Sequence, residues 1–296
     1  MAKTIAFLAC ADTLPGAPHR RPDAFEHDHQ VAALRAGLAG SGTRLLEIDW
    51  RAPLDEICAC DLALVGTPWD YTEDKAAFLA RLEAIAAAGV PLWNPLPMLR
   101  WNADKLYLAE LEALGAPSIP TLWHEAAGPA ELAAAFTHFG GEWLVAKRRV
   151  GAGAVGQALL RRGSEEALGW RADQPVMIQP FLPAIRAEGE LSFIFVDGAL
   201  SHALVKRAQP GDYRIQAAYG GRETALHPAP ADRAAAEAVL ALLPFAAPPL
   251  YARIDMLRLP TGALALIEAE LIEPYLYPLQ GPHFGRRMAQ ALLRRL

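Results

Sequence analysis

The chain has 296 residues, of which 53% are hydrophobic and 21% are charged, an ordinary composition for a globular protein of two or three domains. Its formal net charge of −5 gives no reason to expect a nucleic-acid partner. The three cysteines, Cys10, Cys58 and Cys60, are too sparse for a disulfide framework or a zinc site and fit a reducing compartment. No apolar run approaches the roughly 20 residues of a membrane span, and the first ten residues resemble a buried strand rather than a signal peptide. We therefore expect a cytoplasmic protein without a membrane partner.

Short apolar strands alternate with helices over about the first hundred residues. This alternation predicts a parallel sheet with crossover helices, and hence an α/β class. The expected strands are 5–10, 45–48, 62–65 and 90–93, and the expected helices are 24–38 and 73–88.

The rest of the chain has a different pattern, typical of α+β structure. Asp197-Gly198 lies between two apolar runs, which is a strong signal for a two-residue hairpin turn. A second hairpin turns around Pro260-Thr-Gly262. The expected helices are 102–114, 232–243 and a polar helix at the carboxyl end, and the expected strands are 143–149, 157–161, 176–179, 190–196, 199–207, 251–257 and 264–271.

Charged residues alternate along the last hairpin. Side chains two apart on a strand share a face, so Arg253 and Asp255 lie together, as do Glu268 and Glu270. A turn at 259–262 would place Arg253 opposite Glu268, and Leu257 opposite Leu264. Three carboxylates and one arginine then share a surface, and Mg²⁺ is the natural cation to relieve their repulsion. The alternatives are a solvated strand face, or a simple ion pair between Arg253 and Glu268.

Lys147 ends a predicted strand just before the glycine-rich segment 151–156. Glycines let backbone N–H groups approach phosphate oxygens, and the lysine adds positive charge. No Gly-Lys-Ser/Thr follows, so this is not a P-loop, and the spacing does not match the dinucleotide fingerprint. An ordinary hairpin loop is the alternative.

Taken together, these motifs resemble the ATP-grasp superfamily of ligases over about residues 94–275. The motifs that carry the resemblance are Trp101-Asn-Ala-Asp-Lys105, Lys147 with the glycine-rich segment, Gln179-Pro-Phe-Leu182, Glu190, Lys206 with Arg214, Arg253-Ile-Asp255 and Glu268-Ala-Glu270. The family usually has Glu-x-Asn where this chain has Glu268-Ala-Glu270, and Pro274 comes one residue later than usual.

The resemblance implies a role for each of these residues. It implies ATP binding by Lys105, Lys147, Gly151, Gly153, Gln179, Phe181, Leu182, Glu190 and Lys206, and Mg²⁺ binding by Asp255, Glu268 and Glu270. Arg214 and Arg253 would be catalytic and would stabilise oxyanion charge. The implied fold is an N-terminal Rossmann-like domain (1–100), a central ATP-grasp subdomain (101–184) and a C-terminal ATP-grasp subdomain with the metal site (185–296).

Three N-terminal motifs are Thr67-Pro-Trp-Asp-Tyr71, Leu92-Trp-Asn-Pro95 and Trp101-Asn102. They resemble a glutathione-synthetase-like bacterial group that includes the O-ureido-serine cyclo-ligase of D-cycloserine biosynthesis. Trp69, Asp70 and Tyr71 follow a strand and are candidates to line a substrate crevice, as is Asp28 on the first helix. Alternatively, Trp69 belongs to the core, Asp70 caps the next helix, and Asp28 is a solvated charge.

The resemblance implies an ATP- and Mg²⁺-dependent carboxylate–amine ligase that acts through an acyl phosphate on a small amino-acid-like substrate. The nitrogen comes from a second molecule or, in a cyclo-ligase, from the same one. Two alternatives stay open: a nucleotide-binding protein without turnover, and a carboxylate kinase. A homodimer is left open as the oligomeric state.

Overall fold

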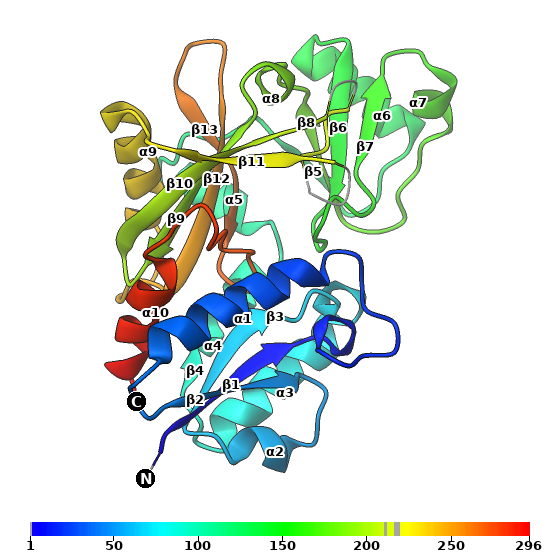
Figure 1. Cartoon of the computed structure of the whole chain (residues 1–296). Coiled ribbons are helices and arrows are strands. Elements are labelled where there is room, and N and C mark those ends of the chain that lie inside the picture. The colour runs from blue at the N-terminus through cyan, green and yellow to red at the C-terminus, as the bar shows by residue number, and fades with distance from the viewer. Residues whose placement is uncertain (1, 210–211, 216–219) are drawn as a thin grey trace.

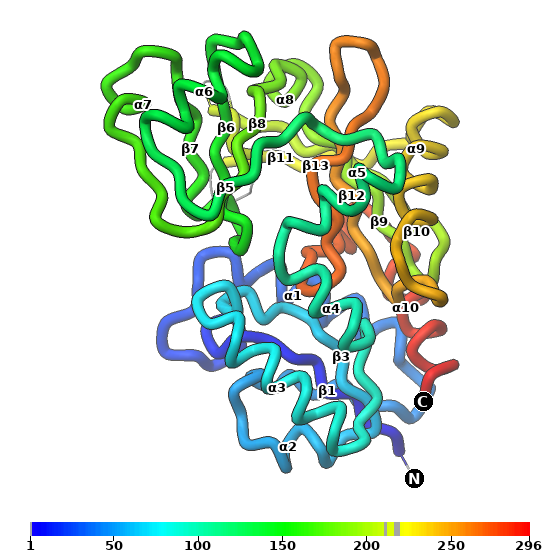
Figure 2. The backbone as a smooth tube through the Cα atoms, turned by 180° about the vertical axis from the view of Figure 1, so that it is seen from behind, coloured from blue at the N-terminus to red at the C-terminus, as the bar shows by residue number. Residues whose placement is uncertain are grey.

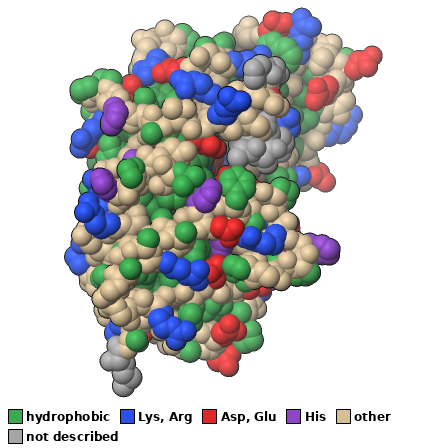
Figure 3. All heavy atoms as spheres, viewed as in Figure 1, with side chains coloured by type: hydrophobic (Ala, Val, Ile, Leu, Met, Phe, Trp, Pro, Cys, Tyr) green, Lys and Arg blue, Asp and Glu red, His purple; other side chains and the backbone are tan. Residues whose placement is uncertain are grey.

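Three β-sheets organise the chain (Figure 1). The computed structural model describes residues 2–209, 212–215 and 220–296. Among these, no helix is long and apolar enough to cross a membrane, and all three cysteines are free thiols. Figure 3 shows basic and acidic side chains interspersed over one face, which agrees with the small net charge.

The first sheet is parallel in every strand pair, with the order β2-β1-β3-β4, which confirms the α/β prediction. Its strands are β1 (Thr4–Ala9), β2 (Arg44–Asp49), β3 (Leu62–Thr67) and β4 (Leu92–Trp93). Every residue of β3 is buried, as expected for a strand covered on both faces. The helices of this region are η1 (Ala11–Thr13), α1 (Ala24–Leu38), α2 (Leu54–Cys58), η2 (Tyr71–Glu73) and α3 (Lys75–Ala87).

The second sheet is antiparallel, with the order β5-β8-β6-β7. Its strands are β5 (Leu122–His124), β6 (Trp143–Arg148), β7 (Ala158–Arg161) and β8 (Val176–Pro180). The helices are α4 (Leu96–Asn102), α5 (Tyr107–Ala113), α6 (Pro129–Phe139), α7 (Glu165–Gly169) and α8 (Ala184–Ala187).

The single helix expected at 102–114 is wrong, because the chain breaks between α4 and α5. The backbone N–H of Lys105 leaves the helical pattern and donates to the carbonyl of Arg149 at 3.0 Å. The carboxylate of Asp104 accepts the N–H of Leu106 at 3.0 Å. These bonds to groups outside a helix satisfy the backbone and turn Lys105 out of the helical path.

The third sheet has the order β11-β10-β9-β12-β13, and all its strand pairs are antiparallel. Its strands are β9 (Glu190–Val196), β10 (Ala199–Arg207), β11 (Arg222–Leu226), β12 (Tyr251–Arg258) and β13 (Leu264–Glu270), and its helices are α9 (Pro230–Ala241) and α10 (Phe284–Leu293). The Asp197-Gly198 turn is confirmed: its residues have φ of 53° and 77°, as a tight primed turn requires.

The register expected for the last hairpin is wrong. Arg258, rather than Leu257, lies opposite Leu264, and a β-bulge follows between Asp255 and Met256. Each feature shifts the pairing by one residue. Arg253 therefore lies opposite Glu270, and Asp255 opposite Glu268. A shift of two residues preserves the alternation of side chains, so the charged groups still share one face.

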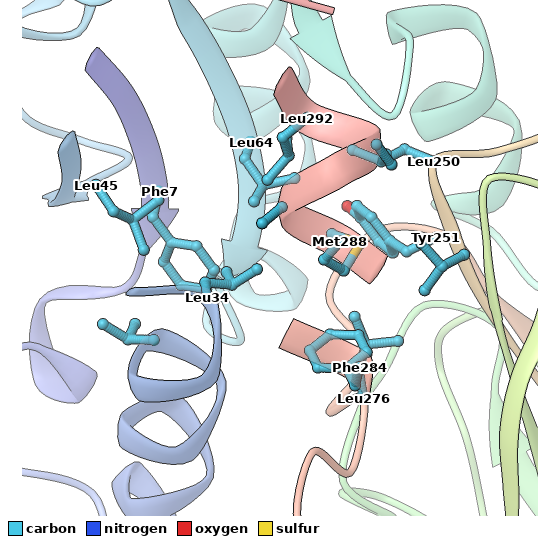
Figure 4. Close-up of a cluster of buried hydrophobic side chains, with 14 of the residues drawn as sticks. Phe7, Leu34, Leu45, Leu64, Leu250, Tyr251, Leu276, Phe284, Met288 and Leu292 are labelled. Atoms are coloured by element: carbon cyan, nitrogen blue, oxygen red, sulfur yellow. The ribbon is translucent and has the colours of Figure 1, made fainter. Parts of the chain in front are cut away.

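The carboxyl-terminal helix α10 packs on α1 of the first region. The two backbones meet at glycines, since a Cβ on Gly37 would lie 2.1 Å from the carbonyl oxygen of Gly285. Figure 4 shows Phe7 and Leu34 in one hydrophobic cluster with Met288 and Leu292. Both termini lie at the end of the molecule that holds the parallel sheet (Figure 2). The first and third regions therefore share a core, and the domain limits at 100 and 184 stay a prediction.

Candidate active site

A cavity of about 580 Å³ is lined by residues from all three regions. Trp69 and Tyr71 contribute from the first, Lys147 from the second, and Lys206 and Glu268 from the third. Such a cavity has the size of a small-molecule site. Every candidate site residue expected from the sequence lines it except Asp28.

Side chains from α4 and α5 hold the edge strand β13 that carries two of the candidate carboxylates. The amide of Asn102 donates to the carbonyl of Ala269 at 2.6 Å and accepts the N–H of Leu271 at 2.7 Å. The hydroxyl of Tyr107 accepts the N–H of Ala269 at 3.0 Å. These bonds satisfy backbone groups that an open sheet edge would leave unpaired. They also fix Glu268 and Glu270 on the two sides of Ala269.

Buried charges of alternating sign cross the third sheet. Lys206 lies between Glu190, at 2.5 Å, and Asp255, at 3.2 Å. Arg253 pairs with Asp255, at 2.9 Å, and with Glu270. Four of the five residues are at least nine-tenths buried, and the side chain of Glu270 is 21% exposed. Because these side chains are largely removed from water, each charge is stabilised mainly by the opposite charges beside it.

The carboxylates of this chain differ in their pKa. Burial raises the pKa of Glu190 to about 6, against the opposing effect of Lys206. Burial likewise raises the pKa of Glu270 to about 7, although Arg253 opposes it. Burial also acts on Asp255, but there Arg253 and Lys206 prevail and lower its pKa. Further positive charge beside Glu190 and Glu270 would therefore stabilise the ionised forms of these carboxylates.

Lys105 connects the edge strand to the glycine-rich segment. Its ammonium donates to the carbonyl of Gly151 at 2.6 Å and lies 2.9 Å from the carboxylate of Glu268. Burial favours the neutral amine, but Glu268 outweighs it and raises the pKa of Lys105. A charged amine is thus held at the wall of the cavity.

Lys147 also faces the cavity, from β6. No hydrogen bond or ion pair joins its ammonium to another residue in the described part of the chain. Burial lowers the pKa of Lys147, and the more distant Glu268 and Glu190 offset this only in part. A partly buried amine without a partner in the described part of the chain favours an anionic ligand.

The glycine-rich segment turns over the cavity next to Lys147. Gly153 and Ala154 have φ of 61° and 62°, and Gly156 has φ of 73°. Position 156 favours glycine because of its positive φ, and the Cα of Gly156 lies close to the side chain of Arg148. The segment therefore brings backbone close to the cavity.

Gln179, Phe181 and Leu182 line the same cavity, where β8 leaves the second sheet. The amide of Gln179 donates to the hydroxyl of Thr121 at 2.9 Å, and the N–H of Phe181 donates to the carbonyl of Trp143 at 3.1 Å. The N–H of Leu182 has no partner among the described residues. It is the backbone donor of this segment that a ligand can still use.

Arg214 lines the cavity from the short described segment 212–215. Its guanidinium forms a bidentate ion pair with Asp212, with a shortest distance of 2.8 Å. It thus adds positive charge at this rim.

Trp69 and Tyr71 form the wall from the first region. The indole N–H of Trp69 donates to the carbonyl of Glu273 at 2.9 Å, and the guanidinium of Arg21 lies 4.9 Å from the Trp69 ring centre. Tyr71 is buried, and its ring lies 5.0 Å from that of Phe78. Trp69 is only partly buried, so it is a cavity residue rather than a core residue.

The remaining first-region candidates are held by structural partners. The carboxylate of Asp70 accepts from the indole of Trp50 at 2.7 Å and pairs with Arg51. Asp70 makes no capping bond, and Asp74 instead caps α3, so the capping alternative for Asp70 is wrong. Asp28 lies outside the cavity lining, in an exposed ion pair with Arg20 at 2.7 Å.

Five cavity carboxylates were missed by the sequence reasoning, namely Asp12, Asp23, Glu26, Glu73 and Glu273. Glu273 follows β13 and is 8% exposed, and burial raises its pKa to about 8. Burial also raises the pKa of Glu26, on α1, to about 8. Neither side chain has a hydrogen bond or ion pair with a described residue. The spacing of Glu268, Glu270 and Glu273 was the available signal for Glu273, whereas nothing distinguished Glu26 from its polar neighbours.

The three candidate metal ligands have suitable chemistry, since hard cations prefer carboxylate oxygens. Among the described residues, however, no group of three or more His, Cys, Asp or Glu is arranged to hold a metal ion. The reason is visible in the ion pairs, because Asp255, Glu268 and Glu270 each face a lysine or arginine. The donor set fits Mg²⁺ if these carboxylates turn from their present partners.

Comparisons with known proteins agree on one group. The family described as the N-terminal domain of D-cycloserine synthetase DcsG matches residues 5–94. The cycloserine biosynthesis protein DcsG of Streptomyces lavendulae is 29% identical over 263 residues, which cover 84% of this chain and 87% of that protein. A crystal structure of D-cycloserine synthetase DcsG has a TM-score of 0.80 and 25% identity, covering 99% of each chain. The D-alanine–D-alanine ligase of Bacillus anthracis, in complex with ATP, shares the fold with a TM-score of 0.67 and 16% identity, covering 98% of this chain and 95% of that one.

Proposed function

We propose that the chain, which has the fold of known ATP-grasp ligases, is an ATP-dependent ligase that converts a carboxylate into an acyl phosphate and joins it to a nitrogen. One observation carries the proposal. A single cavity combines a partly buried lysine without a partner in the described part of the chain, a glycine-rich segment and a row of carboxylates. Phosphoryl transfer needs little covalent help from the protein, and this set supplies what it does need, namely positioning and charge.

ATP would lie between the second and third sheets. The free N–H of Leu182 suits an acceptor nitrogen of adenine, and Glu190 suits the ribose hydroxyls. Lys147 and Lys105 would offset the phosphate charge, and the N–H groups at Gly151 and Gly153 would cover the phosphates. The related ligase with bound ATP supports the choice of nucleotide.

Asp255, Glu268 and Glu270 would hold Mg²⁺, which supplies positive charge to the phosphates during transfer. Their position at the Lys105 end of the cavity supports this role. Binding of the cation would free Lys105 from Glu268, and the amine could then turn to a phosphate. The same exchange would relieve the repulsion among the carboxylates.

The substrate carboxylate would attack the γ-phosphate beside Lys206, Arg253 and Arg214. The two arginines would then stabilise the oxyanion as nitrogen attacks the acyl phosphate, a role typically worth about 10²–10³ in rate. Trp69 and Tyr71 would bound the space left for the rest of the substrate. Arg253 is already fixed by Asp255, so it needs little reorganisation.

We propose a small amino-acid-like substrate and, as the favoured reaction, an intramolecular ligation. The similarity to DcsG over most of both chains supports this choice. We also propose a cytoplasmic location, where free thiols and ATP coexist.

ADP release tests the proposal against its alternatives. The purified protein, with Mg-ATP, is offered O-ureido-serine and a panel of amino acids, with and without hydroxylamine to trap an acyl phosphate as the hydroxamate. A ligase gives ADP and a C–N product, a carboxylate kinase gives ADP and hydroxamate without a native C–N product, and a binding protein gives neither.

A pair of variants ties the reaction to the site. Glu268→Gln should lower ADP release by orders of magnitude, because the amide is a poorer ligand for a hard cation. Glu83→Gln is the control and should match the wild type, because Glu83 on α3 forms only an exposed ion pair with Arg100 on α4. Equal activity of Glu268→Gln and wild type would overturn the proposed site.

A further inference from the structure

The ligation step releases a proton that needs an acceptor. The nitrogen lone pair attacks the carbonyl carbon, the bond from that carbon to the phosphate oxygen breaks, and inorganic phosphate leaves. The nitrogen must lose one N–H proton to become an amide. Water is scarce in a buried cavity, so a side chain within hydrogen-bond reach of the nitrogen is the natural acceptor.

Most carboxylates of the cavity are already engaged with positive charge. Glu190 and Asp255 share Lys206, Glu270 pairs with Arg253, and Glu268 pairs with Lys105. A carboxylate in such a pair is a weak base, since its cation stabilises the ionised form.

Glu273, which is buried, and Glu26, which is partly buried, line the cavity without an ion pair or hydrogen bond to a described residue. A buried oxygen of Asp12 also lacks a hydrogen-bond partner, but Asp12 interacts electrostatically with Cys10 and Arg21. The surroundings of Glu273 and Glu26 differ. Glu273 interacts electrostatically with Glu270, Lys105 and Glu268, which lie at the proposed phosphate end. The charged groups acting on Glu26 are instead Asp23, Arg253, Glu223 and Lys206.

The backbone of Glu273 is also fixed in place. Its carbonyl accepts the indole N–H of Trp69 at 2.9 Å, and Pro274 follows it. Burying an unpaired carboxylate costs free energy, so stability alone does not account for this side chain. Burial and the neighbouring Glu270 raise the pKa of Glu273 to about 8 against the opposing effects of Lys105 and Arg253, so its ionised form is a stronger base than a carboxylate held by a cation.

From this geometry we propose that Glu273 is a catalytic residue that accepts the proton of the attacking nitrogen at the acyl phosphate. The inference rests on the proposed ligase function and adds to it the group that makes the nitrogen nucleophilic. The proton passes from nitrogen to a carboxylate oxygen of Glu273 and then to solvent when the product leaves.

Partition between two nucleophiles tests the inference. Wild type, Glu273→Gln, Glu273→Asp and Glu26→Gln are given Mg-ATP and O-ureido-serine, or whichever amino acid releases ADP with the wild type. The native C–N product and the hydroxamate formed with added hydroxylamine are both measured. Hydroxylamine is unprotonated at neutral pH and does not depend on a protein base, so its product reports acyl phosphate formation in a folded enzyme.

We expect Glu273→Gln to lose about 10²–10⁴-fold in native product, the usual contribution of a general base, and to form hydroxamate at the wild-type rate. Glu273→Asp keeps a carboxylate, and its rate of native product formation should lie between those of Glu273→Gln and wild type. The inference is overturned if Glu273→Gln loses both products equally, if it loses neither, or if Glu26→Gln shows the split instead. A wild type that forms neither ADP nor hydroxamate with any substrate overturns the proposed function itself.

Discussion

Replacing Asp255 by asparagine tests both the buried charge network and the proposed metal site. Asp255 is 2% exposed and accepts a hydrogen bond from the hydroxyl of Ser192 at 2.5 Å. It also pairs with Lys206 at 3.2 Å and with Arg253 at 2.9 Å. The substitution keeps the size of the side chain and removes its charge.

The expected loss of stability follows from those partners. Removing one member of a buried ion pair costs about 3–5 kcal/mol, because the other charge is left without compensation. Here Lys206 keeps Glu190 at 2.5 Å, and Arg253 keeps Glu270, so the lower end applies. A loss of about 3 kcal/mol lowers Tm by about 6–12 °C in a protein of this size class.

The assay is a pair of melts, without nucleotide and with Mg-ATP. Saturating ligand at about a hundred times Kd stabilises a protein by about 2.7 kcal/mol, and Asp255→Asn should lose most of this gain if Asp255 holds Mg²⁺. Ser192→Ala is the matched control for the metal role: it removes a neutral donor to the same carboxylate, which costs about 1.5–3 kcal/mol for a hydrogen bond to a charged group, and it should keep the gain from Mg-ATP. A variant as stable as wild type without nucleotide would refute the network argument. An Asp255→Asn variant that is stabilised by Mg-ATP as much as the wild type would refute the role of Asp255 as a ligand of Mg²⁺.

Three further outcomes follow from the same geometry. Lys147→Ala should weaken ATP binding about ten- to a hundred-fold by calorimetry, as expected for a charge-assisted contact. It should not destabilise the free protein, because the amine has no partner in the described part of the chain; unchanged affinity would contradict its role. Trypsin should cut within 148–156 in the free protein and more slowly with Mg-ATP, since phosphate contacts would order the glycine-rich segment; equal rates would argue against such contacts. Burial raises the pKa of Glu270 to about 7 and of Glu273 to about 8, so the metal-free folded state holds these protons more tightly than the unfolded chain. Its free energy of unfolding should therefore fall as pH rises from about 5 to 8. Denaturant melts at several pH values measure this dependence, and Glu273→Gln should make the free energy of unfolding fall less steeply with pH. An unchanged dependence on pH would exclude a contribution from Glu273.

The sequence alone determined the local features of this protein. The apolar run of β3 predicts a strand buried on both faces, and Asp197-Gly198 predicts a tight turn, because both depend on residues close in the chain. The alternation of Arg253 with Asp255, and of Glu268 with Glu270, likewise predicts a charged strand face without any knowledge of the partner.

Only the tertiary structure decided which charges meet. The register at the turn and the bulge after Asp255 each shift the pairing by one residue, so the partner of Arg253 is Glu270 rather than Glu268. Glu268 meets Lys105 because a break between two helices turns that lysine toward the sheet edge.

The structure also decided where the polar motif residues act. Asn94 and Asn102 belong to motifs that carry the resemblance to known ligases, and their amides bind backbone groups of the third sheet: Asn94 donates to the carbonyl of Leu271 at 2.8 Å. An amide bonds equally well to a ligand and to a strand edge, and only the folded chain shows which is near. The same holds for Glu273, whose burial without a partner arises from segments of the first and third regions that are far apart in the sequence.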